Sequence, residues 1–151
     1  MASYRVREGS ITAADSFTNL GSLYGQATTS SVQVPAGSNA IVGMIVSVTQ
    51  DGATAGAATF AVQLTGDGLT EQQTLTVGSA TNVGTETSNG QTNMPFKCDV
   101  NIPCTASNQV SIAGAMDADL GTAQLSVTLI FASVISNGKR AQSICALFVN
   151  K

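Results

Sequence analysis

The chain has 151 residues, of which 43% are hydrophobic and only 10% charged, and its formal net charge is −3. This length suits one domain with its own core, and the composition excludes a disordered chain and a coiled coil, both of which need many charged residues. Because the sequence contains no histidine, it excludes every catalytic triad, dyad or metal site that depends on an imidazole group.

The basic residues lie near the two ends of the chain and at one central position: Arg5, Arg7, Lys97, Lys139, Arg140 and Lys151. No lysine or arginine occurs between Glu8 and Phe96. Binding to a nucleic-acid backbone needs several clustered cations. We therefore expect no strong nucleic-acid binding.

The first residues are charged and no apolar stretch follows them. No apolar run approaches the roughly 18 residues that a membrane span needs. The sequence therefore predicts synthesis in the cytoplasm without a secretory leader.

The first 29 residues are expected to form an N-terminal arm or an edge strand of a single β-sandwich domain. Their best helical window, 11–23, has irregularly spaced apolar residues and is interrupted by Gly21. The core of the domain is expected to span 30–135. Residues 136–151 are expected to form a C-terminal hairpin and strand.

The first half of this core contains four predicted strands. A short strand is predicted at 31–34, and the next stretch, 41–48, is apolar on both faces. Such a stretch indicates either a central strand covered on both sides or a subunit contact. Residues 58–65 alternate between apolar residues on one face and mostly polar residues with Ala61 on the other, which is typical of a half-buried strand. A shorter strand is predicted at 72–77.

The second half contains the longest alternating stretch, 94–104, in which the apolar residues share one face. They are Met94, Phe96, Cys98, Val100, Ile102 and Cys104. A short strand at 110–113 precedes a second clear alternation at 125–131, and an apolar strand is predicted at 144–149.

Turn residues separate these stretches. Asn89-Gly90 and Asn137-Gly138 are the strongest hairpin signals, because asparagine and glycine accept the positive φ of a type I′ turn. Further breaks occur at Pro35-Ala36-Gly37, Asp51-Gly52 and Gly66-Asp67-Gly68. Eight or nine short strands separated by turns predict an all-β fold, either a sandwich or a barrel.

An internal similarity refines this prediction. The segment Val32-Gln33-Val34-Pro35, followed by Ser38-Asn39 and a new strand, resembles Val100-Asn101-Ile102-Pro103, followed by Ser107-Asn108 and another strand. Proline marks the strand end in both units because it cannot donate to the ladder. Two such units in corresponding places predict a double Greek key, so we expect an antiparallel β-sandwich with the eight strands of a single jelly roll.

The three cysteines are Cys98, Cys104 and Cys145. Within one extended strand, Cys98 and Cys104 would lie about 20 Å apart, which is too far for a disulfide. We expect buried, reduced cysteines that act as small hydrophobic residues, and the alternative is pairing of Cys104 or Cys145 with another segment or subunit. A zinc site is disfavoured because no histidine can complete the ligand set.

Carboxylates offer one candidate cluster, with Asp117 and Asp119 in one predicted loop and Asp67 in another. Such oxygens bind hard cations, above all calcium. Their spacing does not match an EF-hand, however, and loop aspartates commonly cap turns. We therefore predict no metal site, no cofactor and no catalytic residue.

The apolar strand at 144–149 follows Lys139 and Arg140. An uncovered edge strand of this kind would promote aggregation. We expect it to be covered, either as the last strand of its own sandwich or by strand addition to a neighbouring subunit.

Three segments, 34–39, 64–69 and 125–131 after Asp119-Leu120-Gly121, carry a resemblance to a known family. They resemble small single jelly-roll capsid proteins of icosahedral viruses, notably of prokaryotic hosts, over roughly residues 30–135. The resemblance implies a jelly roll that oligomerises around symmetry axes and encloses a genome, in some cases over an inner membrane. Many such families bind the genome with a long basic arm, whereas this chain has only Arg5 and Arg7 near its start. An inner membrane, other inner proteins or a minor, penton-type role would account for that difference.

We therefore predict a virion structural protein without enzymatic activity, a capsid subunit that binds copies of itself and other capsid proteins. The contacts are expected in the N-terminal segment, the C-terminal strand and the flanks of the sandwich. Uncharged flanks favour this hypothesis because closely packed copies of a strongly charged subunit repel one another. The alternatives are an extracellular appendage or surface-layer subunit and a receptor- or glycan-binding β-sandwich module.

Overall fold

The computed structural model describes residues 2–11, 17–21, 31–51, 57–81, 91–117, 122–134 and 143–147. In this part of the chain the ordered elements are strands, and no helix is present that could cross a membrane. The strands are β1 (Ser3–Ile11), β2 (Thr18–Asn19), β3 (Ser31–Gln33), β4 (Ala40–Asp51), β5 (Ala57–Thr65), β6 (Gln73–Thr81), β7 (Gln91–Pro103), β8 (Gln109–Met116), β9 (Thr122–Ala132) and β10 (Ser143–Leu147).

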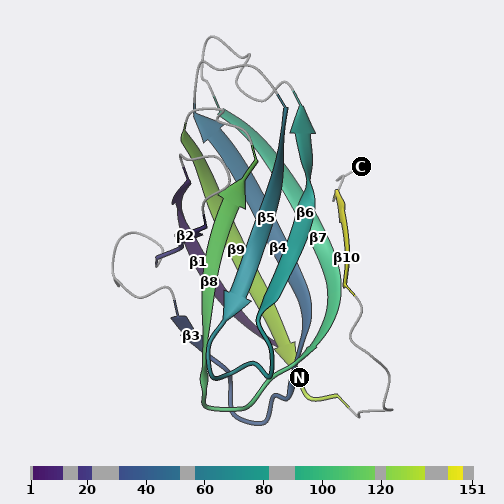
Figure 1. Ribbon diagram of the computed structural model, residues 1–151. Coiled ribbons are helices and arrows are strands. Elements are labelled where there is room, and N and C mark those ends of the chain that lie inside the picture. Colours follow the sequence, from purple (N-terminus) through teal and green to yellow (C-terminus); the bar gives the residue numbers. More distant parts are fainter. Residues whose placement is uncertain are drawn as a thin grey trace.

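These strands form two antiparallel sheets that pack face to face (Figure 1). The first sheet has the order β1-β9-β4-β7-β10, and the second has the order β2-β8-β5-β6, with β3 also paired to β8. Without β10, this is the order of a single jelly roll with two Greek keys, in which the short strands β2 and β3 share one strand position. The predicted all-β fold, antiparallel sandwich and jelly roll are therefore confirmed, and β10 is an additional strand at the edge.

The core lies between the two sheets and is built from the alternating residues. The inward side chains of β5, β7 and β9 are buried as their patterns predict: Ala58, Phe60, Val62 and Leu64; Phe96, Cys98, Val100 and Ile102; and Leu125, Val127, Leu129 and Phe131. The side chain of Met94, the first residue of the predicted inward set, lies outside the described residues. Burial of these apolar side chains is the main source of stability in such a sandwich.

The hairpins that the sequence predicts at Asn89-Gly90 and Asn137-Gly138 are wrong. The strands before and after the first turn, β6 and β7, belong to different sheets, and β10 pairs with β7 and not with β9. Both turns themselves lie outside the described residues. In a jelly roll most connections cross from one sheet to the other, so a good turn signal does not imply that its flanking strands pair. By contrast, the consecutive strands β5 and β6 do pair with each other, and the turn at Gly66-Asp67-Gly68 connects them.

The two ends of the described chain lie at opposite edges of the same sheet. All residues of β1 pair with β9 at one edge, and β10 pairs with β7 of its own chain at the other (Figure 1). The described part of the C-terminal strand therefore extends its own sandwich, which was one of the two arrangements expected for it.

The two similar units of the sequence contact each other at one end of the sandwich. The backbone N–H of Val34 donates to the carbonyl of Asn108 at 2.9 Å, and the N–H of Ser107 donates back to the carbonyl of Val34 at 2.9 Å. The N–H of Cys104 donates to the carbonyl of Asn39, also at 2.9 Å. Each unit carries the chain from one sheet to the other, as the double Greek key requires.

Two glycines allow a direct test of this end of the molecule. Gly66 has a φ of +114°, and a Cβ there would lie 2.6 Å from the carbonyl oxygen of Gln109, whereas Gly37 has a φ of +83° and open space around it. We expect Gly37→Ala to cost about 1 kcal/mol, from the left-handed conformation alone, and Gly66→Ala to cost roughly 2–3 kcal/mol, because the backbone must also move. Urea denaturation measures both losses, and equal losses would contradict the close approach at Gly66.

Candidate functional site

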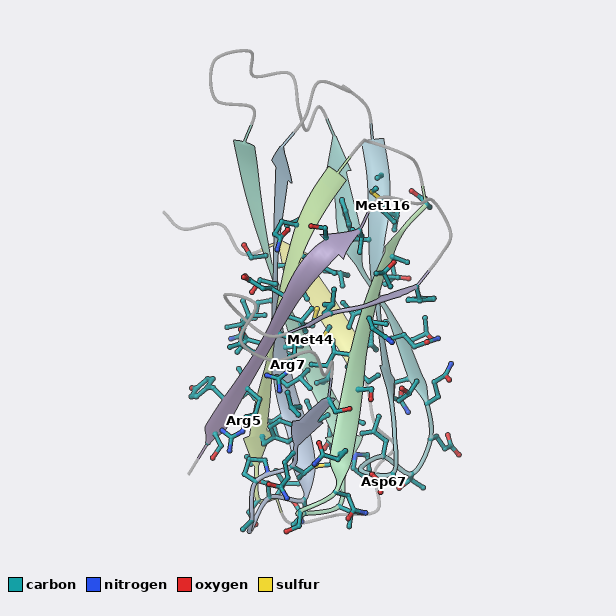
Figure 2. The ribbon with its side chains drawn as sticks, turned by 90° about the vertical axis from the view of Figure 1, so that its left-hand side faces the viewer. Arg5, Arg7, Met44, Asp67 and Met116 are labelled. Carbon is teal, nitrogen blue, oxygen red and sulfur yellow. The ribbon has the colours of Figure 1, made fainter. Side chains whose placement is uncertain are left out.

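The candidate carboxylates do not form a cluster. Asp67 lies in the turn between β5 and β6, where its Oδ1 accepts from the N–H of Gln109 at 2.9 Å and its carbonyl accepts from Asn108 Nδ2 at 3.1 Å. Asp117 follows β8 at the other end, and its Oδ1 accepts from the N–H of Thr59 at 2.7 Å. Figure 2 labels Asp67 and Met116, the neighbour of Asp117, at opposite ends of the sandwich. The length of β8 therefore separates the two carboxylates by about 25 Å.

This separation contradicts a shared cation site at Asp67 and Asp117. Each carboxylate instead accepts from a backbone N–H of a distant strand, Gln109 for Asp67 and Thr59 for Asp117. These bonds are not the local turn caps that the sequence offered as the alternative. Asp119 lies outside the described residues. Within the described ranges, no group of three cysteine, aspartate or glutamate side chains could hold a metal ion.

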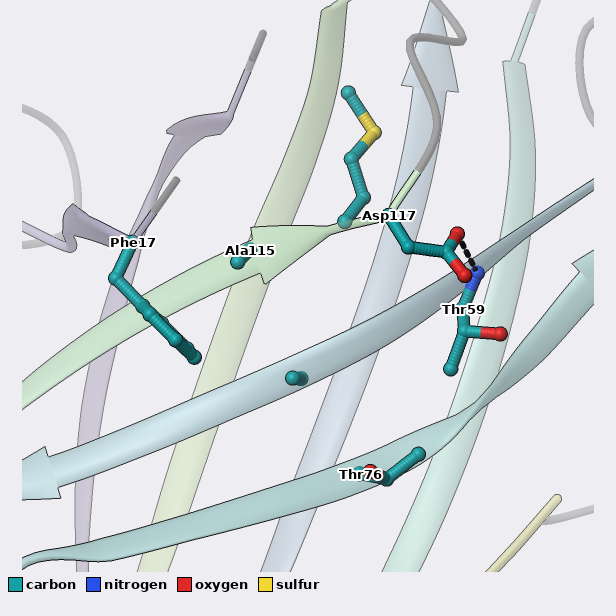
Figure 3. A pocket seen from close by; sticks show the side chains of 7 residues that line it. Phe17, Thr59, Thr76, Ala115 and Asp117 are labelled. Carbon is teal, nitrogen blue, oxygen red and sulfur yellow. Dashed lines mark hydrogen bonds between the residues drawn. The ribbon is translucent and has the colours of Figure 1, made fainter. Parts of the chain in front are cut away.

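A hollow of about 270 Å³ lies beside Asp117, on the outer face of the sheet formed by β8, β5 and β6. Its lining is mostly small and apolar and includes Ala61 and Ala115, with the ring of Phe17 at one side (Figure 3). Phe17 is 38% exposed. The polar groups that the hollow offers are the hydroxyls of two threonines and the Asp117 carboxylate, which already accepts from a backbone N–H. The sequence around Phe17 has no pattern that indicates its position over β8, so this hollow could not be predicted from the sequence.

The cysteines differ from one another in their chemical state. Cys98 is disulfide-bonded, whereas Cys104 is free and buried. The prediction that Cys98 and Cys104 do not bridge each other is confirmed, but the expectation of reduced thiols is wrong for Cys98. The sheet register places the backbone of Cys145 directly opposite Cys98. The distance argument considered cysteines on a single strand, and it could not foresee which strand lies beside β7.

Burial raises the pKa of the Cys104 thiol from 9.0 to about 11. Between these two values the unfolded chain loses the thiol proton while the folded chain retains it, so the free energy of unfolding falls as the pH rises. We expect a loss of up to about 1.4 kcal/mol per pH unit in this window, and none of it below pH 9. Urea denaturation at several pH values, compared with Cys104→Ala, isolates this contribution from those of tyrosine and lysine. The same pH dependence in both proteins would contradict a buried, ionisable thiol.

The two arginines of β1 lie at the edge of the sandwich where β1 of the first sheet is close to β3 of the second (Figure 2). Arg7 joins the two sheets, because its Nη2 donates to the carbonyl of Ser31 on β3 at 2.7 Å. Arg5 is exposed, and its Nη1 donates to the carbonyl of Tyr4 at 2.9 Å. Charged side chains that point inward from an edge strand protect that edge against pairing with other chains. The structure thus gives Arg7 a structural role that its sequence context did not reveal.

Large parts of both sheets carry no charge. The sequences of β5, β6, β8 and β9 contain no lysine, arginine, aspartate or glutamate. Their outward positions hold short side chains, mainly threonine, serine, glutamine and alanine. The fold and its surfaces define a jelly-roll β-sandwich protein in which the strands of the second sheet are uncharged, whereas β1 and β7 of the first sheet carry charged residues.

Comparisons by sequence identify no relatives: no family model matches the chain, and no curated protein has a significantly similar sequence. Solved structures with a similar fold include Eiger TNF from S. frugiperda, with a TM-score of 0.48 and 10% identity over 93% of this chain and 98% of that one. They also include the PRD1 vertex protein P5, with a TM-score of 0.43 and 10% identity over 85% of this chain's length and 96% of that protein's.

A third similar structure is that of infectious bursal disease virus, Gx strain. It has a TM-score of 0.34 and 18% identity, over 93% of this chain and 39% of the viral chain. The assignment of this chain as a jelly roll rests on its own strand order and register.

Proposed function

We propose that the chain is a virion structural protein, a capsid subunit that self-assembles into an icosahedral shell. The observation that carries this proposal is the absence of charge from the sequences of β5, β6, β8 and β9. A shell brings many copies of one surface close together, and charged copies would repel one another. The face formed by β5, β6 and β8, which carries no charged side chain, avoids this repulsion and allows close packing of copies.

In this role the protein acts through its shape and catalyses no reaction. Its partners are further copies of the chain and other capsid proteins. The protein is made in the cytoplasm of the host and ends in the virion.

Contact with the genome is not part of the proposed role. Arg7 is occupied in joining β1 to β3, which leaves Arg5 as the exposed arginine of that strand. Two cations fall well short of the clustered charge that phosphate binding needs. An inner membrane or other inner proteins would then lie between this shell and the genome.

Negative-stain electron microscopy of the purified chain tests the proposal. We expect closed particles of uniform diameter. Fibres would favour an appendage subunit joined by donated strands, and a field of single small molecules would contradict self-assembly of either kind.

The hollow beside Phe17 favours a second candidate, a receptor- or glycan-binding module. An exposed aromatic ring next to hydroxyl and carboxylate groups is a common arrangement in sugar recognition. A monomer that stays soluble at high concentration and binds glycans or calcium in a titration would support this candidate over the shell protein.

A further inference from the structure

Four apolar side chains lie together on the outer face of the sheet formed by β1, β9 and β4. The core residues of β9, such as Leu129 and Phe131, point inward, so Ile130 between them points outward. The register places Tyr4 of β1 directly opposite Ile130. It also places Val6 of β1 opposite Thr128 of β9.

The register of β4 completes this group. Ile45 lies opposite Thr128 on the side away from β1, and Gly43 lies opposite Ile130. Residues opposite each other in an antiparallel pair share a face. Tyr4, Val6, Ile45 and Ile130 therefore occupy two adjacent rows of the outer face, and we refer to these four residues as the outer patch.

The outer patch is open to solvent in part. Tyr4 is 58% exposed and Ile45 38% exposed, and these two are among the three large apolar residues that are exposed in the described part of the chain. Val6 and Ile130 are half-buried. The stretch 41–48 is apolar on both faces because β4 faces the core with Met44 and Val46 and faces outward with Ile45. β9 and β1 do not cover Ile45, since they lie beside β4 in the same sheet.

Charged residues flank the outer patch at its two sides. Glu8 lies on β1, one row beyond Val6 on the same face and opposite Ser126. Lys97 lies on β7 directly opposite Ile45, and Asp99 lies opposite Gly43. Both β7 residues are exposed. One side of the patch thus offers a carboxylate and the Tyr4 hydroxyl, and the other side offers an ammonium group and a carboxylate.

We propose that the outer patch is the contact between two copies of the chain related by a two-fold axis. If the axis runs along the strands between β9 and β4, then β1 of each copy lies over β7 of the other. The registers then place Tyr4 of one copy over Asp99 of the second copy and Val6 over Lys97. Glu8 lies one row, about 7 Å along the strand, from Lys97 of the second copy, so these two side chains meet diagonally. Each pairing occurs twice, as in any two-fold contact, and the two patches stack at the centre. An axis perpendicular to the strands would place β1 over β1, where Glu8 faces no partner of opposite sign.

This inference rests on the proposed function, because it names the surface through which the self-assembling copies meet. It commits to a second copy because the charges of the face are complementary to themselves under one symmetry operation. Apolar residues at the centre with charged pairs at the rim are also the usual anatomy of a protein contact.

The first test disrupts the centre of the patch. Ile45→Lys places one lysine of each copy at the dry centre of the contact. A buried charge without a partner is strongly unfavourable there. Sedimentation velocity should show loss of association by at least a hundredfold in the dissociation constant. Thr74→Lys places the same charge on an exposed position of the opposite sheet and is the matched control. It should associate as the unmodified chain does.

The second test exchanges the charges at the rim and does not depend on Ile45. Glu8→Lys and Lys97→Glu should each weaken association about tenfold, because each creates two like-charged pairs in the dimer. The double variant should associate nearly as well as the unmodified chain. Circular dichroism of each variant checks that the sheets are formed.

The outcomes separate this inference from the proposed function. If the unmodified chain associates but Ile45→Lys and Thr74→Lys behave alike, or if the double charge exchange restores nothing, then the outer patch is not the contact, and the proposed function stands. If the unmodified chain is a monomer at every concentration, both proposals are overturned. Binding of a monomer to lipid vesicles that is lost in Ile45→Lys would assign the face to a membrane and would also overturn the inference.

Discussion

Replacing Phe60 by alanine is expected to lower the free energy of unfolding by about 3–5 kcal/mol, which is the usual cost of removing a buried aromatic ring. Phe60 is fully buried on β5, between its ladder partners Gly78 of β6 and Met116 of β8. A domain of this kind has a total stability of roughly 5–15 kcal/mol. The variant should therefore unfold at a much lower urea concentration, and no intact shell should form from it at elevated temperature.

Thr74→Ala is the matched control, because Thr74 is an exposed residue of the same sheet. It should change the free energy of unfolding by no more than about 0.5 kcal/mol. If Phe60→Ala lost no more than this control, the inner face of β5 would not be packed against the other sheet.

Removing residues 143–151 should abolish the formation of closed particles. The deletion removes β10 and uncovers the edge of β7 over residues 96–100, where the two strands pair. A long, newly exposed edge strand pairs readily with other chains, so we expect aggregates in place of shells when the truncated protein is examined by electron microscopy.

Removal of residues 148–151 alone is the appropriate control, since it keeps every paired residue of β10. This shorter deletion should leave assembly intact. Normal particles from the longer deletion would show that β10 is dispensable and would contradict its role in covering β7.

Local patterns predicted the strands of this fold well. The alternation of residues 58–65, 94–104 and 125–131 identified β5, β7 and β9 and their inward faces, because a half-buried strand alternates between its two faces. The similarity between the units around Pro35 and Pro103 indicated the double Greek key. Both features depend on neighbouring residues only, which is why the sequence displays them.

Pairing between distant strands was not predictable in the same way. No local signal shows that β10 lies beside β7, and the Asn137-Gly138 turn suggested a hairpin that does not form. The disulfide state of Cys98 depends on that same pairing. The positions of Asp67 and Asp117 at opposite ends of β8 likewise follow from the direction of one strand in the assembled sheet. Their bonds to the N–H groups of Gln109 and Thr59 also join distant parts of the chain, so the local turn caps expected from the sequence did not indicate them.

The central claim is that this protein works by repeating one rigid shape. Light scattering of the purified, unmodified chain over a range of concentrations measures this directly. The account predicts a single population of large particles of uniform mass in equilibrium with small assemblies. A lone species of 15.2 kDa at every concentration would contradict it.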